Sequence, residues 1–318
     1  MVRKIALEEH FLCPSTTGYW LPTMSEVPPA FVRKLSAALA DFGDGRLEVM
    51  DRGGIERCVL AVSGPGVQAE RDAATAVRNA SASNDFLATQ IQKRPDRYSG
   101  FAHLAMQDAR AAADELERCM RDLKFCGAMI NGQTHGVYLD DPSLYPFWER
   151  AEALGAVVYL HPADPEAVYP ALASYKSLQR ATWGWGVETG SHALRLVFGG
   201  LFDRFPKAKF ALGHTGETLP YLLWRFDSRA KLYNVKLKRE PSQYIKDNIW
   251  VTISGMYSPE PLVCALAALG RDRVMFSADY PFEDCGEACA FMDTVAVDEG
   301  VRADVAYNNA ARLLGLPG

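Results

Sequence analysis

Acidic residues and histidines follow several short apolar runs of this sequence. The first run leads into Glu8-Glu9-His10, the run AVVYL is followed by His161, and the run VMFSA is followed by Asp279. Residues two apart on a β-strand point to the same face, so Glu8 and His10 can bind one metal ion together while Glu9 points to the other face. Carboxylate and imidazole ligands suit a divalent cation such as Mn²⁺, Mg²⁺ or Zn²⁺. We expect His161 and Asp279 to supply the third and fourth ligands.

Eight short apolar runs alternate with helical patterns and predict the strands that position these residues. They cover residues 4–7, 57–62, 98–102, 125–130, 156–160, 208–212, 249–253 and 273–277. Helical spacing is clear between several of them, as in the segment from Pro259 to Gly270, which has a first-turn proline and a terminal glycine. Strands that alternate with helices form parallel sheets, and eight such units close best as a (β/α)₈ TIM barrel of the α/β class. No glycine-rich G-x-G-x-x-G turn follows the first run, which disfavours a doubly wound sheet.

The organisation predicted from this pattern is one barrel domain over residues 1–318. Proline-rich and aromatic stretches at residues 13–30 and 162–186 interrupt the alternation after strands 1 and 5. They are too long for ordinary βα loops, and we expect them to fold over the barrel mouth as lids. No internal repeat or linker marks a domain boundary.

Barrel enzymes carry their chemistry at the carboxyl ends of the strands, where four of the six histidines of this chain fall. Glu8 would be a costly unpaired carboxylate in an apolar barrel, which also favours a cation beside it. Asn131 and His214 follow strands 4 and 6. His103 follows strand 3 and either supports the site or belongs to the core. We interpret the two remaining histidines, His135 and His192, as non-catalytic.

Composition excludes several classes of protein. The chain has 318 residues, 48% hydrophobic and 23% charged, with a net charge of -5, so it is an ordinary folded protein rather than a disordered one. Without a basic stripe we expect no nucleic-acid partner. No apolar stretch approaches the roughly 18 residues that span a bilayer, and the start has no signal-peptide core, so we expect no membrane partner and a cytoplasmic location. The seven scattered cysteines predict neither a disulfide framework nor a zinc site built from cysteine thiolates.

Several motifs, spread over nearly the whole chain, resemble one family. They are ALEEH, FCGAMING, VVYLHP, ETGSHALRLVFGGLFDRFP, LGHTGETLPYLLWRFD and FSADYPFED. The chain resembles the amidohydrolase superfamily, and within it the non-hydrolytic branch that includes aminocarboxymuconate-semialdehyde decarboxylase. The narrowest similarity is to the γ-resorcylate (2,6-dihydroxybenzoate) and 2,3-dihydroxybenzoate decarboxylases of that branch.

The resemblance implies a role for each motif residue. Glu8, His10, His161 and Asp279 would be the metal ligands. His214 and Glu217 of GHTGE would form a catalytic relay, although an acidic residue that opens a helix also stabilises the helix dipole. The aromatic pocket would be lined by Asn131, Arg225, Tyr280 and Phe282. Tyr280 departs from the tryptophan expected there, which leaves the ring substituents open.

The function expected on these grounds is non-oxidative decarboxylation of an ortho-hydroxybenzoate to the phenol and CO₂. CO₂ cannot leave an aromatic ring directly without an aryl anion, so the ring carbon must first be protonated, and Asp279 is the expected acid. We expect one divalent ion, Mn²⁺ first with Zn²⁺ or Mg²⁺ as alternatives, and no organic cofactor. A small aromatic acid would be the substrate. The resemblance also implies a homo-oligomer, either a tetramer or a dimer.

Two other classes of function stay open at this point. The same barrel could hydrolyse a lactone or amide, with His214 polarising the carbonyl group and Asp279 taking the proton. A non-catalytic barrel would have no reason to gather acidic residues and histidines at one mouth. Product analysis separates the first alternative from decarboxylation, and a failure to bind divalent metal would favour the second.

Overall fold

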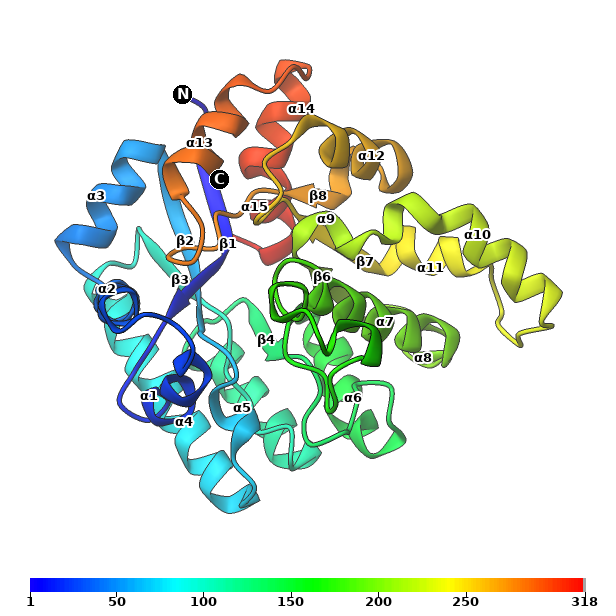
Figure 1. Cartoon of the computed structure of the whole chain (residues 1–318), viewed down its shortest axis with the longest axis horizontal. Coiled ribbons are helices and arrows are strands. Elements are labelled where there is room, and N and C mark those ends of the chain that lie inside the picture. Colours follow the sequence, from blue (N-terminus) through cyan, green and yellow to red (C-terminus); the bar gives the residue numbers. More distant parts are fainter. Residues whose placement is uncertain (317–318) are drawn as a thin grey trace.

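A ring of parallel strands surrounded by helices forms the centre of the molecule in the computed structural model, which describes residues 1–316 (Figure 1). The strands are β1 (Lys4–Phe11), β2 (Ile55–Val62), β3 (Tyr98–Gly100), β4 (Gly127–Asn131), β5 (Val157–His161), β6 (Lys209–Leu212), β7 (Ile249–Thr252) and β8 (Val274–Met275). They pair in parallel as two sheets, β1-β2-β3 and β4-β5-β6-β7-β8. All eight lie where the sequence predicts them, with β3 and β8 shorter than expected, and the α/β barrel class is confirmed.

Two seams join these sheets into the barrel. A parallel bridge between Ala102 and Ala128 connects the end of β3 to β4. At the other seam, the Ser277 hydroxyl that follows β8 accepts hydrogen bonds from the backbone N–H groups of Leu7 at 3.2 Å and of Glu8 at 2.5 Å. Together with the backbone hydrogen bond from His10 N–H to the carbonyl oxygen of Tyr280 at 2.8 Å, this side chain connects β1 to the segment after β8, close to the predicted ligands.

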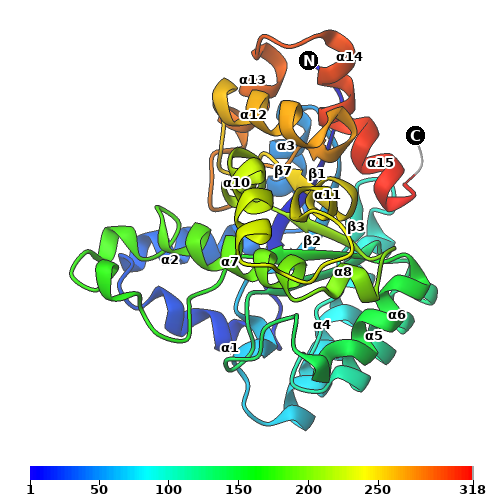
Figure 2. The same cartoon turned by 90° about the vertical axis from the view of Figure 1, so that its right-hand side faces the viewer.

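The helices pack around the strands in chain order (Figures 1 and 2). They are α1 (Thr17–Trp20), α2 (Pro29–Leu39), α3 (Asp44–Gly53), α4 (Ala73–Lys93), α5 (Ala109–Arg121), α6 (Tyr145–Leu154), α7 (Gly184–Phe198), α8 (Leu201–Arg204), α9 (His214–Glu217), α10 (Leu219–Leu232), α11 (Pro241–Asn248), α12 (Pro259–Leu269), α13 (Cys285–Thr294), α14 (Glu299–Ala303) and α15 (Asn309–Leu314). As predicted, α12 begins at Pro259 and ends before Gly270. Within the described residues no helix is both long and apolar enough to cross a membrane.

Alternate residues of each strand face two different apolar clusters. In β2, Val59 and Ala61 belong to a cluster made mainly of strand residues, which fills the barrel interior. Cys58 and Leu60 pack instead with residues of the surrounding helices. The period of two therefore separates an inner core, which is mainly apolar, from an outer one.

The two segments predicted as lids contact each other. The segment after β1 contains α1 and α2, and the segment after β5 contains two short 3₁₀ turns, Pro170–Leu172 and Lys176–Leu178. Arg180 donates a hydrogen bond to the carbonyl oxygen of Thr23 at 2.9 Å, and Lys176 forms an ion pair with Glu26. In Figure 2 both segments extend from the same side of the barrel. Their closure over a substrate stays a prediction.

Candidate metal centre

An irregularity in β1 turns the first two predicted ligands inward. Between Ala6 and Glu9, three steps along β1 correspond to two steps along β2, so β1 contains a bulge. Leu7 already lies in the inner cluster, and unbroken alternation would therefore point Glu8 toward the outer helices. The extra residue brings Glu8 back to the interior, on the same side as His10.

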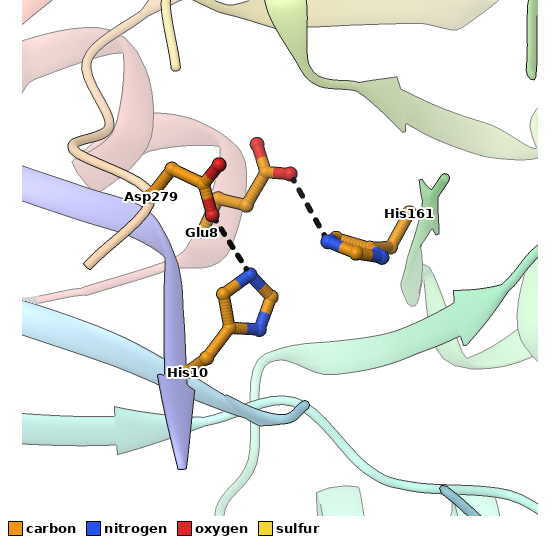
Figure 3. A group of neighbouring side chains, drawn as sticks. All are labelled: Glu8, His10, His161 and Asp279. Atoms are coloured by element: carbon orange, nitrogen blue, oxygen red, sulfur yellow. Dashed lines mark ion pairs between the residues drawn. The ribbon is translucent and has the colours of Figure 1, made fainter. Parts of the chain in front are cut away.

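The four predicted metal ligands converge at the carboxyl ends of β1, β5 and β8 (Figure 3). One ligand atom from each of Glu8, His10, His161 and Asp279 lies within 4.8 Å of the others. Nε2 of His10 is 3.1 Å from Oδ1 of Asp279, and Nε2 of His161 is 3.6 Å from Oε1 of Glu8. Mixed oxygen and nitrogen atoms that converge on one point make a donor set for a divalent cation.

Several of these atoms are buried without a hydrogen-bond partner. Among the described residues they include Oε1 of Glu8, both ring nitrogens of His10 and Oδ1 of Asp279. Buried polar atoms are almost always paired, so a group of unpaired ones that face a common point fits a site that binds a cation. Nδ1 of His161 lies 2.8 Å from the carbonyl oxygen of Pro162, a contact that puts the ring proton on Nδ1 and leaves Nε2 free to bind a metal. The residues present therefore fit a divalent metal ion.

Electrostatics favour the protonation states that metal ligands need. Burial lowers the pKa of His10 and of His161 to about 4, so both rings are neutral near pH 7. Burial raises the pKa of the Glu8 carboxyl, but the positive charge of His214 and the hydrogen bond from Ser254 are among the effects that outweigh it, and the net effect lowers that pKa. Burial and the negative charge of Glu8 raise the pKa of Asp279, an effect that a bound cation would oppose.

Hydroxyl groups hold one oxygen of Glu8. The Tyr159 hydroxyl donates a hydrogen bond to Oε2 of Glu8 at 2.6 Å, and the Ser254 hydroxyl donates to the same oxygen. Sequence analysis missed both residues. Tyr159 precedes His161 by two positions on β5, so the period of a strand could have placed it on the same face. Nothing in the sequence marks Ser254, which lies beyond the end of β7.

Glu9 holds the backbone on both sides of Asp279. Its carboxylate accepts hydrogen bonds from the backbone N–H of Ala278 at 2.8 Å and of Tyr280 at 3.3 Å. Asp279 between them has a φ of 53°, in the left-handed region that residues other than glycine rarely adopt. Outward-facing Glu9 therefore contributes to the site through the loop that carries Asp279.

His214 lies on a left-handed turn that brings it to Glu217. The φ values of His214, Thr215, Gly216, Glu217 and Thr218 are 49°, 53°, 82°, 51° and 67°. Each non-glycine residue in this conformation costs about 1–2 kcal/mol. The turn places Nδ1 of His214 2.6 Å from Oε1 of Glu217. The short element α9 is therefore a turn and not a regular right-handed helix, because Thr215 and Gly216 have non-helical torsion angles. The expectation that Glu217 opens a helix is corrected: Glu217 is the last residue of this turn, and the helix α10 begins at Leu219.

The charge on His214 follows from this contact. Burial lowers the pKa of His214, but the carboxylates of Glu217 and Glu8 outweigh it and raise the pKa to about 10. Nε2 of His214 lies 3.9 Å from Oε1 of Glu8, at the edge of the ligand cluster. The structure thus gives a positively charged imidazole beside the metal site.

The four residues predicted to contact the substrate lie in different surroundings, and not all of them are near the candidate ligands. The Asn131 amide is buried with neither its oxygen nor its nitrogen hydrogen-bonded to a described residue, and the Phe282 ring lies 5.5 Å from the His10 ring. The Tyr280 ring instead packs under the guanidinium of Arg46, 4.9 Å away. Arg225 is exposed on α10 and forms no hydrogen bond or ion pair with any residue in 1–316. Asn131 pairs with the candidate ligand His161 in the register of β4 and β5. The structure thus places Asn131 and Phe282 next to candidate ligands, while no hydrogen bond or ion pair within residues 1–316 links Arg225 to them.

The other histidines contact backbone groups. Nε2 of His103 accepts a hydrogen bond from the backbone N–H of Val67 at 2.9 Å, and Nε2 of His192 accepts one from Leu139 at 2.8 Å. His135 is exposed, with Nε2 2.8 Å from the carbonyl oxygen of Glu70. These contacts hold loops, and none of the three rings belongs to the group of four candidate ligands.

Comparisons with known proteins show which proteins this chain resembles. The family model described as Amidohydrolase matches residues 35–316. The γ-resorcylate decarboxylase of Polaromonas sp. (strain JS666) is 39% identical, with 98% of each chain covered. A structure of 2,6-dihydroxybenzoate decarboxylase complexed with 2,6-dihydroxybenzoate has a TM-score of 0.93 and 38% identity, covering 99% of this chain and 100% of that one. A dihydroxybenzoic acid decarboxylase from Polaromonas sp. JS666, with bound manganese and the inhibitor 2-nitroresorcinol, also has a TM-score of 0.93 and 38% identity, covering 99% and 98%.

Proposed function

Because the chain belongs to the amidohydrolase family, we propose that it is a metal-dependent carboxy-lyase that decarboxylates an ortho-hydroxybenzoate to the phenol and CO₂. The observation that carries the proposal is the group of four ligand atoms within 4.8 Å at the strand ends. The decarboxylase names of the relatives favour this reaction over hydrolysis of a lactone or amide. 2,6-Dihydroxybenzoate (γ-resorcylate) is the first candidate substrate, with 2,3-dihydroxybenzoate as the alternative.

The metal would be held by Glu8, His10, His161 and Asp279. We propose Mn²⁺ as the first candidate, because its presence in a 38% identical structure agrees with the mixed carboxylate and imidazole ligands found here. Zn²⁺ and Mg²⁺ are the alternatives. When bound, the ion supplies positive charge for the phenolate and carboxylate oxygens of the substrate.

Asp279 is the proposed proton donor. It transfers a proton to the ring carbon that bears the carboxylate, the bond between that carbon and the carboxylate then breaks, and the electron pair returns to the ring as CO₂ leaves. The position of Asp279 supports this role, because its buried Oδ1 accepts no hydrogen bond from a described residue and lies within the ligand cluster, 3.1 Å from Nε2 of His10. Asp279 takes up one proton in each turnover, when the substrate binds, and gives that proton to the ring carbon.

The remaining site residues bind and orient the substrate in this proposal. The cationic His214, fixed by Glu217, attracts the anionic substrate. The free amide of Asn131 can hydrogen-bond a ring substituent, and the Phe282 ring packs against the aromatic face. Tyr280 contributes through its backbone, since its ring faces Arg46.

Arg225 is exposed in the single chain, and it can contact the substrate only if an oligomer covers its surface. It lies on α10 beside Tyr221 and Trp224, which are 81% and 76% exposed, and α10 lies at the outer edge of the molecule (Figures 1 and 2). Apolar residues this exposed are typical of an interface. We propose a homo-oligomer, a tetramer or a dimer, in which this face is covered and Arg225 contacts the substrate.

Two further proposals concern the whole chain. We propose that residues 1–318 form one domain; the outer core, which contains residues from β1 through to α14, supports this. We also propose a cytoplasmic location, supported by seven cysteines that are all free thiols.

Metal analysis of the purified protein, followed by a screen of hydroxybenzoates with the metal-loaded enzyme, tests the function. We expect one divalent ion per chain, CO₂ release and the matching phenol as the only organic product. Turnover of a lactone or amide without CO₂ release would overturn the proposal in favour of hydrolysis.

A further inference from the structure

Three hydroxyl groups from β5 and β7 surround one side of Glu8. Tyr159 lies in the middle of β5, Thr252 is the last residue of β7, and Ser254 follows two residues later. All three side chains are fully buried in the barrel interior. Their oxygens form a chain, because Thr252 Oγ1 lies 2.8 Å from the Tyr159 hydroxyl and 3.0 Å from Ser254 Oγ.

The two oxygens of Glu8 have opposite surroundings. Oε2 accepts the hydrogen bonds of Tyr159 and Ser254, while Oε1 has no hydrogen-bond partner in the described chain. Oε1 instead faces Nε2 of His161 at 3.6 Å and Nε2 of His214 at 3.9 Å. The hydroxyl groups therefore decide which carboxylate oxygen faces the candidate metal site.

We propose that Tyr159 is a positioning residue that holds Oε2 of Glu8, so that Oε1 alone is presented to the metal. This inference rests on the metal site of the proposed function, but it does not depend on which substrate is used. Tyr159 acts through Glu8 and contacts neither the substrate nor the reacting atoms. Without its hydroxyl, the carboxylate could rotate and lose the orientation that binding requires.

The identity of the side chain supports this role over simple filling of the core. Tyr159 belongs to the apolar inner cluster, where phenylalanine would fill nearly the same space. A buried hydroxyl is costly unless it is hydrogen-bonded, and both contacts of this one belong to the group around Glu8. Packing alone therefore does not explain why residue 159 carries a hydroxyl group, whereas the hydrogen bond to Glu8 does.

Ser254 extends the same group to the other half of the site. Its Oγ accepts a hydrogen bond from the backbone N–H of His214 at 3.2 Å while its hydroxyl donates to Glu8. One hydroxyl thus links the metal ligand to the start of the left-handed turn. Ser254 offers a second and independent position at which the hydrogen bonding of Glu8 can be removed.

The matched control is Tyr98, a tyrosine that is equally buried. It lies at the start of β3, and its hydroxyl donates a hydrogen bond to the carbonyl oxygen of Phe42 at 3.1 Å, with no contact to a metal ligand. Tyr159→Phe and Tyr98→Phe each remove one buried hydroxyl from the same barrel. A purely structural role predicts the same behaviour for both variants.

The experiment measures Mn²⁺ binding to metal-free protein from the EPR signal of free Mn²⁺, together with unfolding in urea, for wild type, Tyr159→Phe, Ser254→Ala and Tyr98→Phe. We expect Mn²⁺ affinity to fall about tenfold to a hundredfold in Tyr159→Phe and Ser254→Ala, the range for residues that orient a metal ligand. Tyr98→Phe should bind Mn²⁺ as wild type does. Affinity in Tyr159→Phe equal to that of wild type would overturn the inference.

A separate assay of decarboxylation by wild type distinguishes the two proposals. Loss of Mn²⁺ affinity in Tyr159→Phe, in a protein whose wild type does not release CO₂ from any hydroxybenzoate, would support this inference and contradict the proposed function. If Tyr159→Phe does not fold, the binding result for Ser254→Ala decides, and wild-type affinity there would also overturn the inference.

Discussion

Two buried glutamates of this barrel accept hydrogen bonds from tyrosine hydroxyls, but the bonds are distributed differently over the two oxygens of each carboxylate. Glu188 on α7 is 3% exposed, and its two oxygens each accept one bond at 2.6 Å, from Tyr138 and from Tyr169. Glu8 on β1 is 0% exposed, and both of its hydrogen bonds go to a single oxygen. One carboxylate is fully satisfied by the protein, and the other keeps an oxygen free.

The difference separates a structural carboxylate from a functional one. Tyr138 follows β4 and Tyr169 follows β5, so Glu188 ties two loops to α7. The free oxygen of Glu8 would cost stability in a protein without a ligand, because a buried hydrogen-bond acceptor without a donor is expensive. Burial alone therefore does not identify the site. The unpaired atom does, because it faces three other potential ligands.

The largest expected effect comes from removing a ligand that leaves the core intact. His161→Ala should lower metal content and decarboxylation by orders of magnitude while the protein still folds, because the side chain lies at a strand end. Metal analysis, the CO₂ assay and circular dichroism check this. Full metal occupancy with normal turnover would remove His161 from the site.

Asp279→Asn separates metal binding from proton transfer. The amide oxygen can still coordinate, so the variant should regain metal at high Mn²⁺ concentration, but it has no acidic proton to give. We expect a rate loss of about 10²–10⁴, typical of a missing general acid, that added metal does not restore. Product NMR in D₂O measures whether the ring hydrogen at the former carboxyl position still exchanges.

Microscopic reversibility defines the result that would contradict Asp279 as the proton donor. Exchange at that carbon needs the same acid as decarboxylation, and both should disappear together in metal-loaded Asp279→Asn. Persistent exchange would show that another group carries the proton, with His214 as the first to examine because Nε2 lies 3.9 Å from Glu8.

Glu188→Met should have the opposite effects to His161→Ala: it should lower stability and leave metal binding unchanged. Removing both acceptors leaves two tyrosine hydroxyls without their partner and should lower the free energy of unfolding by about 1–3 kcal/mol. Mn²⁺ affinity should stay at the wild-type value, because no atom of Glu188 belongs to the ligand group. Urea unfolding and Mn²⁺ titration measure the two quantities. A large loss of Mn²⁺ affinity would mean that the two glutamates are not functionally distinct.

The smallest effect is expected at the exposed Arg225. Arg225→Ala should raise KM more than it lowers kcat if the side chain only holds an oxygen of the bound substrate. Initial rates over a range of hydroxybenzoate concentrations give both constants. An unchanged KM would mean that Arg225 is an ordinary surface residue that does not contact the substrate.

The sequence predicts the barrel and the ligand set because both depend on short-range patterns. Apolar runs mark the strands, and the residues after them mark the carboxyl ends where Glu8, His161 and Asp279 meet. The bulge in β1 could not be predicted from such short-range patterns. It depends on two consecutive backbone N–H groups meeting Ser277, which is far away in the sequence.

The conformation of the loops that carry His214 and Asp279 could not be predicted either. Four of the five residues from His214 to Thr218 are not glycine, so propensity argues against a left-handed turn, and tertiary contacts impose it. Glu9 is a similar case. Alternation correctly points it away from Glu8, but its hydrogen bonds to the loop around Asp279 exist only once β1 and β8 are neighbours.

The most direct test of this account is a crystal structure of the protein grown with Mn²⁺ and measured at the manganese absorption edge. We predict one anomalous peak at the carboxyl ends of β1, β5 and β8, in contact with Oε1 of Glu8, His10, His161 and Asp279, while Oε2 of Glu8 keeps its hydrogen bond to Tyr159. An absent peak at saturating Mn²⁺, or a peak bound by other residues, would contradict the claim that the free oxygen of Glu8 marks the metal centre.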